Sequence, residues 1–310
     1  MEKLDCIGYL APDGLEKQVL DGLTHVTARY DRLILADGPL QAATWAQNIW
    51  LTPLLIPITS IGDGVKKLRS FQRNWAYYPC GTHHRRASLI SKQLPYVSTK
   101  PLPFGSVLPQ ITPQTQLGSW TLLDPQTILA SPGCSSPFPN GELSFEECKA
   151  DPPAGPPGRA YLKLWESLTL LRKFPQKGEH CLELGASPGS WTWVLAKLGA
   201  DVLAVDRAPL DPAIAAMSGV KFQKGDGFSI KPEDVERVDW IFSDIICYPE
   251  KLLSWVKMWV DSGKCRNFVC TIKFQGAEHY KMIPEFAAIP GSKVIHLFHN
   301  KHELTWMLQN

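Results

Sequence analysis

The chain has 310 residues, of which 44% are hydrophobic and 20% are charged, and its formal net charge is +2. This composition is typical of a soluble globular protein, and the length is sufficient for two domains with sizeable cores. A nearly neutral charge excludes a protein that holds nucleic acid through a global basic field, so any such surface must be a local patch.

Three sequence features bear on the cellular location of the protein: its amino terminus, its most apolar stretch and its cysteines. The opening MEKLDCIGYL lacks the apolar core of a signal peptide. Residues 43–61 are interrupted by Gln47, Asn48 and two prolines, so we expect core strand and helix there rather than a membrane span. The eight cysteines include no C-x-x-C pair, which favours buried, reduced thiols over disulfides or a zinc site. We therefore expect a cytoplasmic protein without membrane association or an obligatory metal.

The N-terminal half mixes strand and helix signals. CIGYLA and RLILAD are typical of strands, and GLEKQVLDGL between them is typical of a helix. Residues 95–158 are rich in proline, which stops regular helices and central strands, and they leave room for one hairpin, SWTLLDPQTILAS. We predict a smaller α+β domain over 1–150, with a proline-rich linker, and a second domain over 151–310.

Residues 66–92 interleave basic and aromatic side chains, a mixture suited to phosphate contacts and base stacking. This pattern favours RNA binding by the N-terminal domain, and an amphipathic helix with a solvated basic face is the open alternative. Cys80, His83 and His84 lack a second pair of metal ligands, so we interpret them as part of an ordinary loop. The candidate RNA-binding residues are Lys66, Lys67, Arg69, Arg73, Arg85 and Arg86.

The C-terminal half alternates regularly between helix and strand signals. We expect helices over 159–172, 190–198, 211–217, 249–261 and 277–288. We expect strands over 180–186, 201–206, 220–225, 239–245 and 267–273, followed by a hairpin of 294–300 and 303–309. This order predicts an α/β fold in which a mostly parallel, seven-stranded sheet ends in an antiparallel hairpin strand.

The turn GASPGSW, residues 185–191, follows the first strand of this half, where ligands of parallel sheets bind. Gly185 and Gly189 allow a close approach of backbone to ligand, and Asp206 ends the next strand, where it can accept hydrogen bonds from ribose hydroxyls. The G-x-G-x-x-G fingerprint of dinucleotide sites is absent. The turn therefore suits a ligand with a ribose but no phosphates, such as S-adenosylmethionine, and a purely structural turn is the alternative.

Two further acids follow strands of the same sheet. Asp226, in KGDGF, is placed to receive an adenine amino group, and Asp244, in FSDI, is placed beside the methyl donor. Acids at strand ends also cap helices, but three at successive strands favour one ligand crevice. The expected cofactor-binding residues are Gly185, Ser187, Pro188, Gly189, Ser190, Trp191, Asp206, Asp226 and Asp244.

The segments LELGASPGSWTWVLAKLGADVLAVD, GDGF, SDI, TIK and KHELTWML resemble the FtsJ family of S-adenosylmethionine-dependent RNA ribose 2′-O-methyltransferases. Within it, the chain is most similar to the RlmM type, which methylates a cytidine ribose in large-subunit (23S) ribosomal RNA. The resemblance covers about 159–310 and is weaker over 1–150. It implies a Rossmann-like class I methyltransferase fold, S-adenosylmethionine as the cofactor, ribosomal RNA as the partner and a partly THUMP-like N-terminal region.

The resemblance also implies a catalytic Lys-Asp-Lys-Glu tetrad, with Lys273 as the general base that takes the proton of the ribose hydroxyl. The topology supports this grouping independently, because Asp244 and Lys273 end parallel strands and Glu303 begins an antiparallel one. All three therefore belong to one edge of the sheet. The matching residues are Lys163, Asp244, Lys273 and Glu303.

Two positions depart from the family pattern. Ser190 replaces the second glycine of the usual P-G-G turn, and Ala160 stands where a serine is common. We expect Ser190 to cap the following helix or to bond the cofactor carboxylate.

Other classes of protein stay open at this point. A Rossmann-type oxidoreductase is disfavoured by the missing third glycine and by the terminal hairpin. A non-catalytic RNA-binding module has no need of the four tetrad residues together. A methyltransferase acting on a different RNA is the remaining alternative.

Overall fold

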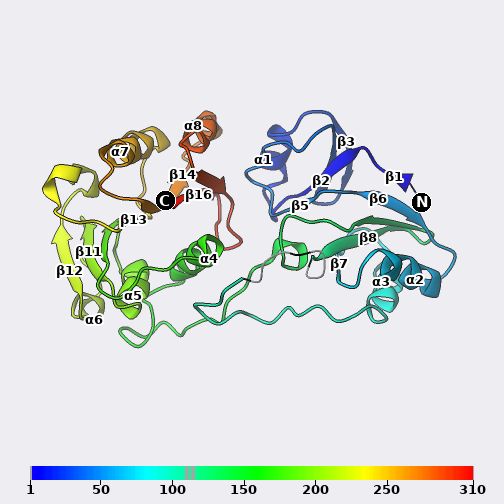
Figure 1. The fold of residues 1–310 in the computed structure, drawn as a ribbon, viewed down its shortest axis with the longest axis horizontal. Helices are drawn as coiled ribbons and strands as arrows, with labels where there is room; N and C mark the ends of the chain where they lie inside the picture. The colour runs from blue at the N-terminus through cyan, green and yellow to red at the C-terminus, as the bar shows by residue number, and fades with distance from the viewer. Residues whose placement is uncertain (1, 109–111, 113–115, 310) are drawn as a thin grey trace. The chain divides into compact units, whose positions relative to one another are not determined.

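The computed structural model describes residues 2–108, 112 and 116–309, and the chain divides into two compact units (Figure 1). Unit 1 comprises Met1–Pro101 and Pro109–Ser144, and unit 2 comprises Leu102–Leu108 and Phe145–Asn310. The short segment 102–108 packs within unit 2, where Leu102 forms a bridge with Phe145 and Phe104 stacks on Trp165 with ring centroids 4.4 Å apart.

Unit 1 contains two sheets, which agrees with the expected α+β composition. The four-stranded sheet has the order β3-β4-β2-β5 and the five-stranded sheet has the order β1-β6-β9-β8-β7. The strands are β1 (Glu2–Lys3), β2 (Cys6–Leu10), β3 (Val26–Tyr30), β4 (Leu33–Asp37), β5 (Asn48–Trp50), β6 (Leu54–Pro57), β7 (Trp75–Tyr77), β8 (Gly118–Asp124) and β9 (Thr127–Ser131). The helices are α1 (Glu16–Asp21), α2 (Ile61–Phe71) and α3 (His84–Ser91), with a 3-10 turn, η1, at Pro139–Gly141. The predicted hairpin is confirmed as β8 and β9.

Helices α2 and α3 of unit 1 are amphipathic, and their apolar faces pack on the five-stranded sheet. Val65 and Leu68 of α2 and Ile90 of α3 share one buried cluster with Trp120 and Ile128 of the sheet. The Ser60 hydroxyl accepts a hydrogen bond from the Asp63 amide at 3.1 Å and so caps α2. The opposite faces of both helices carry the basic residues.

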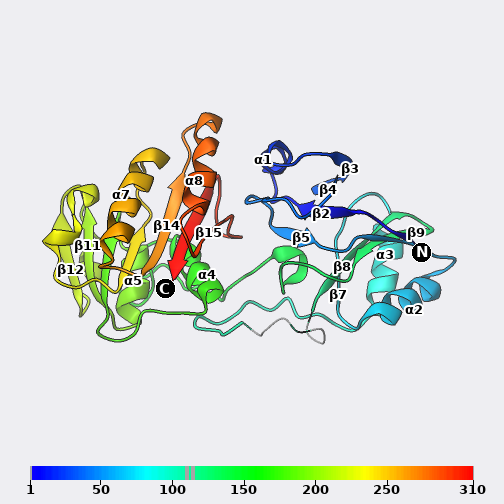
Figure 2. The same cartoon turned by 45° about the horizontal axis from the view of Figure 1, so that its top comes forward.

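Unit 2 is built on a seven-stranded sheet with the order β12-β11-β10-β13-β14-β16-β15 (Figure 2). Neighbours from β12 to β14 are parallel, and β16 is antiparallel to both β14 and β15. The predicted sheet is confirmed in its strand directions. The strands are β10 (His180–Leu184), β11 (Asp201–Asp206), β12 (Val220–Lys224), β13 (Trp240–Ser243), β14 (Asn267–Lys273), β15 (Ser292–Ile295) and β16 (Glu303–Gln309).

The helices of unit 2 follow the expected order. They are α4 (Tyr161–Leu171), α5 (Ser190–Lys197), α6 (Pro212–Ala215), α7 (Pro249–Ser262) and α8 (Ile283–Ala287), with 3-10 turns η2 (Gly227–Ser229), η3 (Pro232–Asp234) and η4 (Ala277–Met282). The central strand β13 is buried along its whole length, as expected for a parallel strand covered on both faces. Across the described ranges, no helix combines the length and the apolar character needed to cross a membrane.

The final hairpin differs from its prediction. The expected strand over 294–300 is realised as β15 at Ser292–Ile295, and residues 296–302 form a loop before β16. The backbone amides of Phe298 and His299 donate to the buried carboxylate of Glu166, so they are not available to a strand ladder. Tertiary hydrogen bonds have overridden the β-like local sequence VIHLFHN here.

Candidate active site

The carboxyl ends of the parallel strands of unit 2 surround a cavity of about 730 Å³. It lies where the sequence predicts a ligand crevice. Six of the residues singled out from the sequence line it, namely Gly185, Ser187, Asp206, Asp226, Asp244 and Lys273.

Gly185 is the position where the turn after β10 needs a glycine. Its φ is +74°, and a Cβ atom there would lie 2.8 Å from the backbone N and Cα of Ile245. No larger side chain fits this close approach of two chain segments. The turn after β10 and the segment after β13 therefore form one continuous wall of the cavity.

Asp206 and Asp226 bring carboxylates to the cavity and also brace its loops. Asp206 accepts hydrogen bonds from the amides of Ser187 and Ala208, both at 2.9 Å. Asp226 accepts one from the Phe228 amide at 3.1 Å and forms an ion pair with Arg207 at 2.8 Å. Asp226 thus also caps the 3-10 turn η2, which was the structural alternative for these acids, whereas Asp206 braces two loops without capping a helix.

The ionisation of Asp226 is controlled by opposing effects. Burial alone would raise the pKa of its carboxyl group, but the Phe228 amide, Arg207 and Lys251 together hold that pKa below its usual value. Asp226 is therefore a carboxylate that can accept hydrogen bonds at neutral pH.

The other predicted cofactor residues of the turn do not line the cavity: Pro188, Gly189, Ser190 and Trp191. Ser190 is buried and its hydroxyl donates to the Gly158 carbonyl at 3.2 Å, while Gly189 occupies the N-cap position of α5. The Trp191 indole donates to the Ala160 carbonyl at 2.8 Å. Ser190 and Trp191 thus tether the segment that leads into α4, the helix that carries Lys163.

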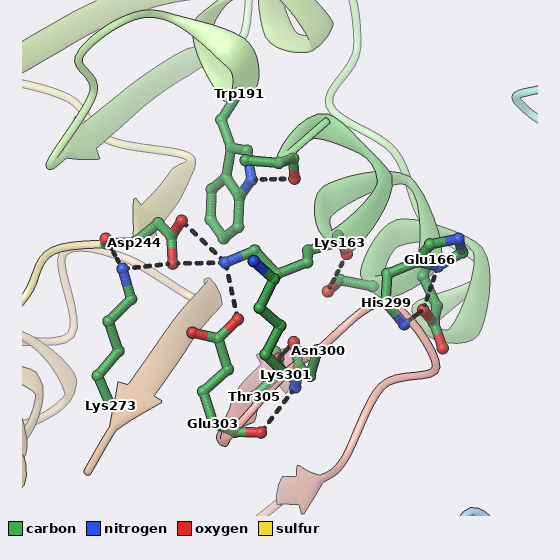
Figure 3. A network of polar contacts seen from close by, with 12 residues as sticks. Lys163, Glu166, Trp191, Asp244, Lys273, His299, Asn300, Lys301, Glu303 and Thr305 are labelled. Atoms are coloured by element: carbon green, nitrogen blue, oxygen red, sulfur yellow. Dashed lines mark hydrogen bonds and ion pairs between the residues drawn. The ribbon is translucent and has the colours of Figure 1, made fainter. Parts of the chain in front are cut away.

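The four residues of the predicted tetrad come together in one polar cluster (Figure 3). Lys163 Nζ lies 2.9 Å from both carboxylate oxygens of Asp244 and 3.0 Å from Glu303 Oε1. Lys273 Nζ lies 3.1 Å from Asp244 Oδ1 and donates to the Asp244 backbone carbonyl. Asp244 therefore bridges the two lysines.

Each tetrad residue is positioned by its secondary structure. Lys163 is buried in the first turn of α4, and Asp244 directly follows β13. Lys273 ends β14 and is the register partner of Glu303, the first residue of β16. Antiparallel pairing thus brings the end of one strand and the start of the other to the same edge.

The opposite charges within the cluster stabilise each other against the cost of burial. Burial would lower the pKa of Lys163, but Asp244 and Glu303 outweigh it and raise that pKa above its usual value. Burial would raise the pKa of Asp244, but Lys163 and Lys273 outweigh it and lower that pKa. Lys163 and Asp244 therefore form a charged pair at neutral pH.

Several polar residues around the site were not found from the sequence. Lys251 Nζ lies 4.4 Å from the ring centroid of Phe228 at the cavity wall. Glu183 is buried in β10 and accepts a hydrogen bond from Thr192 at 2.6 Å, and burial raises its pKa to about 8. Glu166 was also missed, although its position three residues after Lys163 places both on one helical face.

The basic candidates of unit 1 are only partly free for a ligand. Lys66, Arg69, Arg73 and Arg85 are exposed, whereas Lys67 pairs with Asp63 at 2.9 Å. Arg85 and Arg86 line a smaller cavity of about 320 Å³. The set therefore forms a basic surface over α2 and α3.

Two aromatic residues of the same segment are not available for the base stacking that their pattern suggested. Trp75 and Tyr78 are 4% and 1% exposed, because they pack into the cores of unit 1. Cys80 is also buried and its thiol contacts the Thr121 hydroxyl at 3.2 Å. In the part of the chain that the structure describes, no group of three or more His, Cys, Asp or Glu side chains is arranged to hold a metal.

Comparison with known proteins shows a similarity over the part of unit 2 that carries Lys163 and Asp244. The family model described as FtsJ-like methyltransferase matches residues 157–260. The ribosomal RNA large subunit methyltransferase M of Halorhodospira halophila is 32% identical over 161 residues, covering 49% of this chain and 47% of the relative. The protein of the same name from Alkalilimnicola ehrlichii is 30% identical over 190 residues, covering 57% and 51%. The chain thus spans about half the length of the curated relatives it matches.

Among solved structures, TrmN from Thermus thermophilus aligns over 98% of this chain and 99% of its own, with 11% identity and a TM-score of 0.34. The family match covers the first four strands of the sheet, Lys163 and Asp244. It confirms the resemblance noted in the sequence, because residues 157–260 match the FtsJ-like methyltransferase model.

Proposed function

We propose that the protein is an S-adenosylmethionine-dependent methyltransferase that acts on a ribose 2′-hydroxyl of RNA, with a cytidine of large-subunit ribosomal RNA as its target in the cytoplasm. The observation that carries this proposal is the cluster of Lys163, Asp244, Lys273 and Glu303 at the edge of the cavity. The names of the relatives support the choice of ribosomal RNA.

The cavity fits the proposed methyl donor. Asp206 uses each carboxylate oxygen for one backbone amide, and a carboxylate offers about four acceptor sites, so it retains capacity for the hydroxyls of a ribose. Asp226 faces the same cavity and stays ionised, ready to accept from an adenine amino group. When bound, S-adenosylmethionine supplies an electrophilic methyl group on a sulfonium.

The two lysines of the cluster differ in a way that assigns their roles. Lys163 is held by both carboxylates and its side chain is 11% exposed, whereas Lys273 lines the cavity and its side chain is 20% exposed. Lys273 is therefore the amine that reaches an incoming hydroxyl, and in its neutral form its Nζ takes the hydroxyl proton. Lys163 keeps its charge and holds Asp244 and Glu303 in place.

Orientation is the second contribution of the cluster. Displacement at a methyl group requires the nucleophile in line with the leaving group, so a well-held hydroxyl is worth as much as an activated one. Asp244 fixes Lys273 through its side chain and its backbone carbonyl. The orientation of the Lys273 amine is thereby fixed by two acceptors of Asp244.

In unit 1, we propose that the exposed basic residues over α2 and α3 bind RNA phosphates. Lys66, Arg69, Arg73 and Arg85 supply positive charge, and Arg86 contributes through the smaller cavity. Lys67 contributes less, because Asp63 already neutralises it.

The decisive experiment is to map ribose 2′-O-methylation across total RNA, ribosomal RNA included, from cells with the protein, without it, and with only the Lys273→Ala form. The proposal expects one cytidine of the large subunit that is methylated only with the unaltered protein. Loss of methylation at a site in another RNA would redirect the substrate. Identical maps in all three would refute the activity.

A further inference from the structure

We propose that Glu166 is a positioning residue of the tetrad, because it clamps the loop that delivers Glu303 to Lys163. We call residues 296–302, between β15 and β16, the Glu303 loop. This inference deepens the proposed function and rests on it, because it assigns to Glu166 a role in the geometry of the catalytic cluster.

Glu166 makes three hydrogen bonds to the Glu303 loop (Figure 3). Its carboxylate accepts from the Phe298 amide at 2.8 Å, from the His299 amide at 3.0 Å and from His299 Nδ1 at 2.7 Å. Glu166 is only 3% exposed. A buried carboxylate that accepts from two successive amides and a ring nitrogen fixes both the position and the orientation of the loop.

The same helix face holds the loop and the catalytic carboxylate. Lys163 and Glu166 are three residues apart in α4, so their side chains lie side by side on one face. Lys163 binds the carboxylate of Glu303 at 3.0 Å, and Glu166 binds the backbone four and five residues before it. Helix α4 is therefore attached to this stretch of chain at two points.

The remaining residues of the loop carry this constraint to Glu303. The Asn300 side chain donates to the Glu303 carbonyl at 3.2 Å and to the Thr305 hydroxyl at 3.1 Å. His296 Nε2 lies 2.9 Å from the Lys301 carbonyl and closes the loop on itself. Hydrogen bonds thus hold the Glu303 loop both at its contact with Glu166 and at its approach to Glu303.

Strand pairing alone does not position the Glu303 side chain at Lys163. Pairing with β14 sets Glu303 opposite Lys273. The contact between Glu303 and Lys163 also depends on how the Glu303 loop approaches α4. A misplacement of about 1 Å at a reacting group can cost about 100-fold in rate. Loosening the loop is therefore expected to reduce turnover without removing any group that touches a substrate.

The test uses Glu166→Gln in the full-length protein. Glutamine keeps the side-chain volume, but its NH2 group replaces one carboxylate oxygen and cannot accept a hydrogen bond from the Glu303 loop. We expect kcat for RNA methylation to fall about 10- to 100-fold. The dissociation constant of S-adenosylmethionine and the KM for RNA are expected to change less than twofold. A loss confined to KM, or no loss, would overturn the inference.

Glu179→Gln is the matched control. Glu179 also accepts from a backbone amide, that of Gln176, and from a ring nitrogen, that of Trp240, both at 2.9 Å, but it lies at the opposite end of the sheet. If Glu179→Gln lowers kcat as much as Glu166→Gln at a similar thermal stability, the effect is general softening of the fold and the inference fails.

A double-mutant comparison separates positioning from a role of its own. If Glu166 acts through Glu303, adding Glu166→Gln to Glu303→Gln lowers kcat no further. If the two substitutions instead lower kcat by factors that multiply in the double variant, the inference is overturned. If Glu166→Gln does not fold, His299→Ala, which removes one of the three contacts, takes its place in both comparisons.

Hydrogen exchange gives a readout that needs no activity. We expect the amides of Phe298 and His299 to exchange at least tenfold faster in Glu166→Gln than in the unaltered protein, while those of β14 keep their rates. Unchanged exchange would refute the clamp. If these amides exchange faster in Glu166→Gln but the unaltered protein methylates no RNA, the clamp by Glu166 is supported and the proposed function is rejected.

Discussion

Lys273 and Glu303 face each other as register partners on the antiparallel strands β14 and β16. Lys163 reaches Glu303 from α4, and Asp244 joins both lysines from the end of β13. Four separate elements thus meet at one sheet edge. The proposed role of each can be tested by substituting one side chain.

Lys273→Ala is expected to lower the rate of methyl transfer about 100- to 10,000-fold, because it removes the proposed base. Cofactor affinity should persist, since Asp206 and Asp226 are untouched. A tritiated-methyl assay on RNA, with calorimetry for the cofactor, measures both. Turnover at the rate of the unaltered protein would refute the assignment of Lys273.

Asp206→Asn is expected to weaken S-adenosylmethionine binding about 10- to 100-fold, which corresponds to the loss of a charge-assisted hydrogen bond of about 1.5–3 kcal/mol. Asp211→Asn is the control, because Asp211 caps α6 with a bond to the Ala213 amide at 2.9 Å but does not line the cavity. Calorimetry that gives equal affinities for both variants would contradict the assigned role of Asp206.

Glu183→Gln should change the pH dependence of stability. Burial raises the pKa of Glu183 from its usual 4.5 to about 8, so between these values the folded state holds a proton that the unfolded state has lost. Unfolding free energy of the unaltered protein therefore falls as pH rises through this range, and glutamine removes that contribution. Denaturation at pH 5 and pH 8 should show the variant gaining stability relative to the unaltered protein at pH 8. A constant difference would show that Glu183 is ionised in the fold.

Neutralising Arg73 and Arg85 should weaken RNA binding and reduce its salt dependence. Each lost phosphate contact lowers the slope of log affinity against log salt by about 0.7 for single strands. Lys17→Ala is the control, because the Lys17 side chain is 81% exposed on α1 and pairs with Asp21. Filter binding across a salt series measures the slopes, and equal slopes for all three proteins would place RNA binding elsewhere.

The sequence predicted most of unit 2 because its signals are local and repetitive. Residues 267–273 form β14 with the expected bounds, since its centre, FVCTI, consists of apolar and β-branched residues. The resemblance pointed to Asp244, Lys273 and Glu303, and strand direction independently predicted that they share one edge of the sheet. The catalytic interpretation of these residues stays a proposal.

What could not be predicted depends on contacts between distant residues. The run 296–300 looks like a strand, but in the structure it is a loop whose amides at Phe298 and His299 bind the buried carboxylate of Glu166, more than a hundred residues earlier. Trp75 and Tyr78 look like exposed stacking residues beside arginines, but a short strand does not reveal which of its faces is buried. Ser190 shows the same limit, because its partner Gly158 lies 32 residues away.

Strand β16 has a consequence for the synthesis of the protein. It lies between β14 and β15, and its first residue is separated by 140 positions from the lysine it binds. A nascent chain can form the parallel strands and the glycine turn early, but β14 and β15 then have an open edge each and no partner between them. The cluster of Lys163, Asp244, Lys273 and Glu303 is complete only when this strand, which is made after the other strands of the sheet, inserts between β14 and β15.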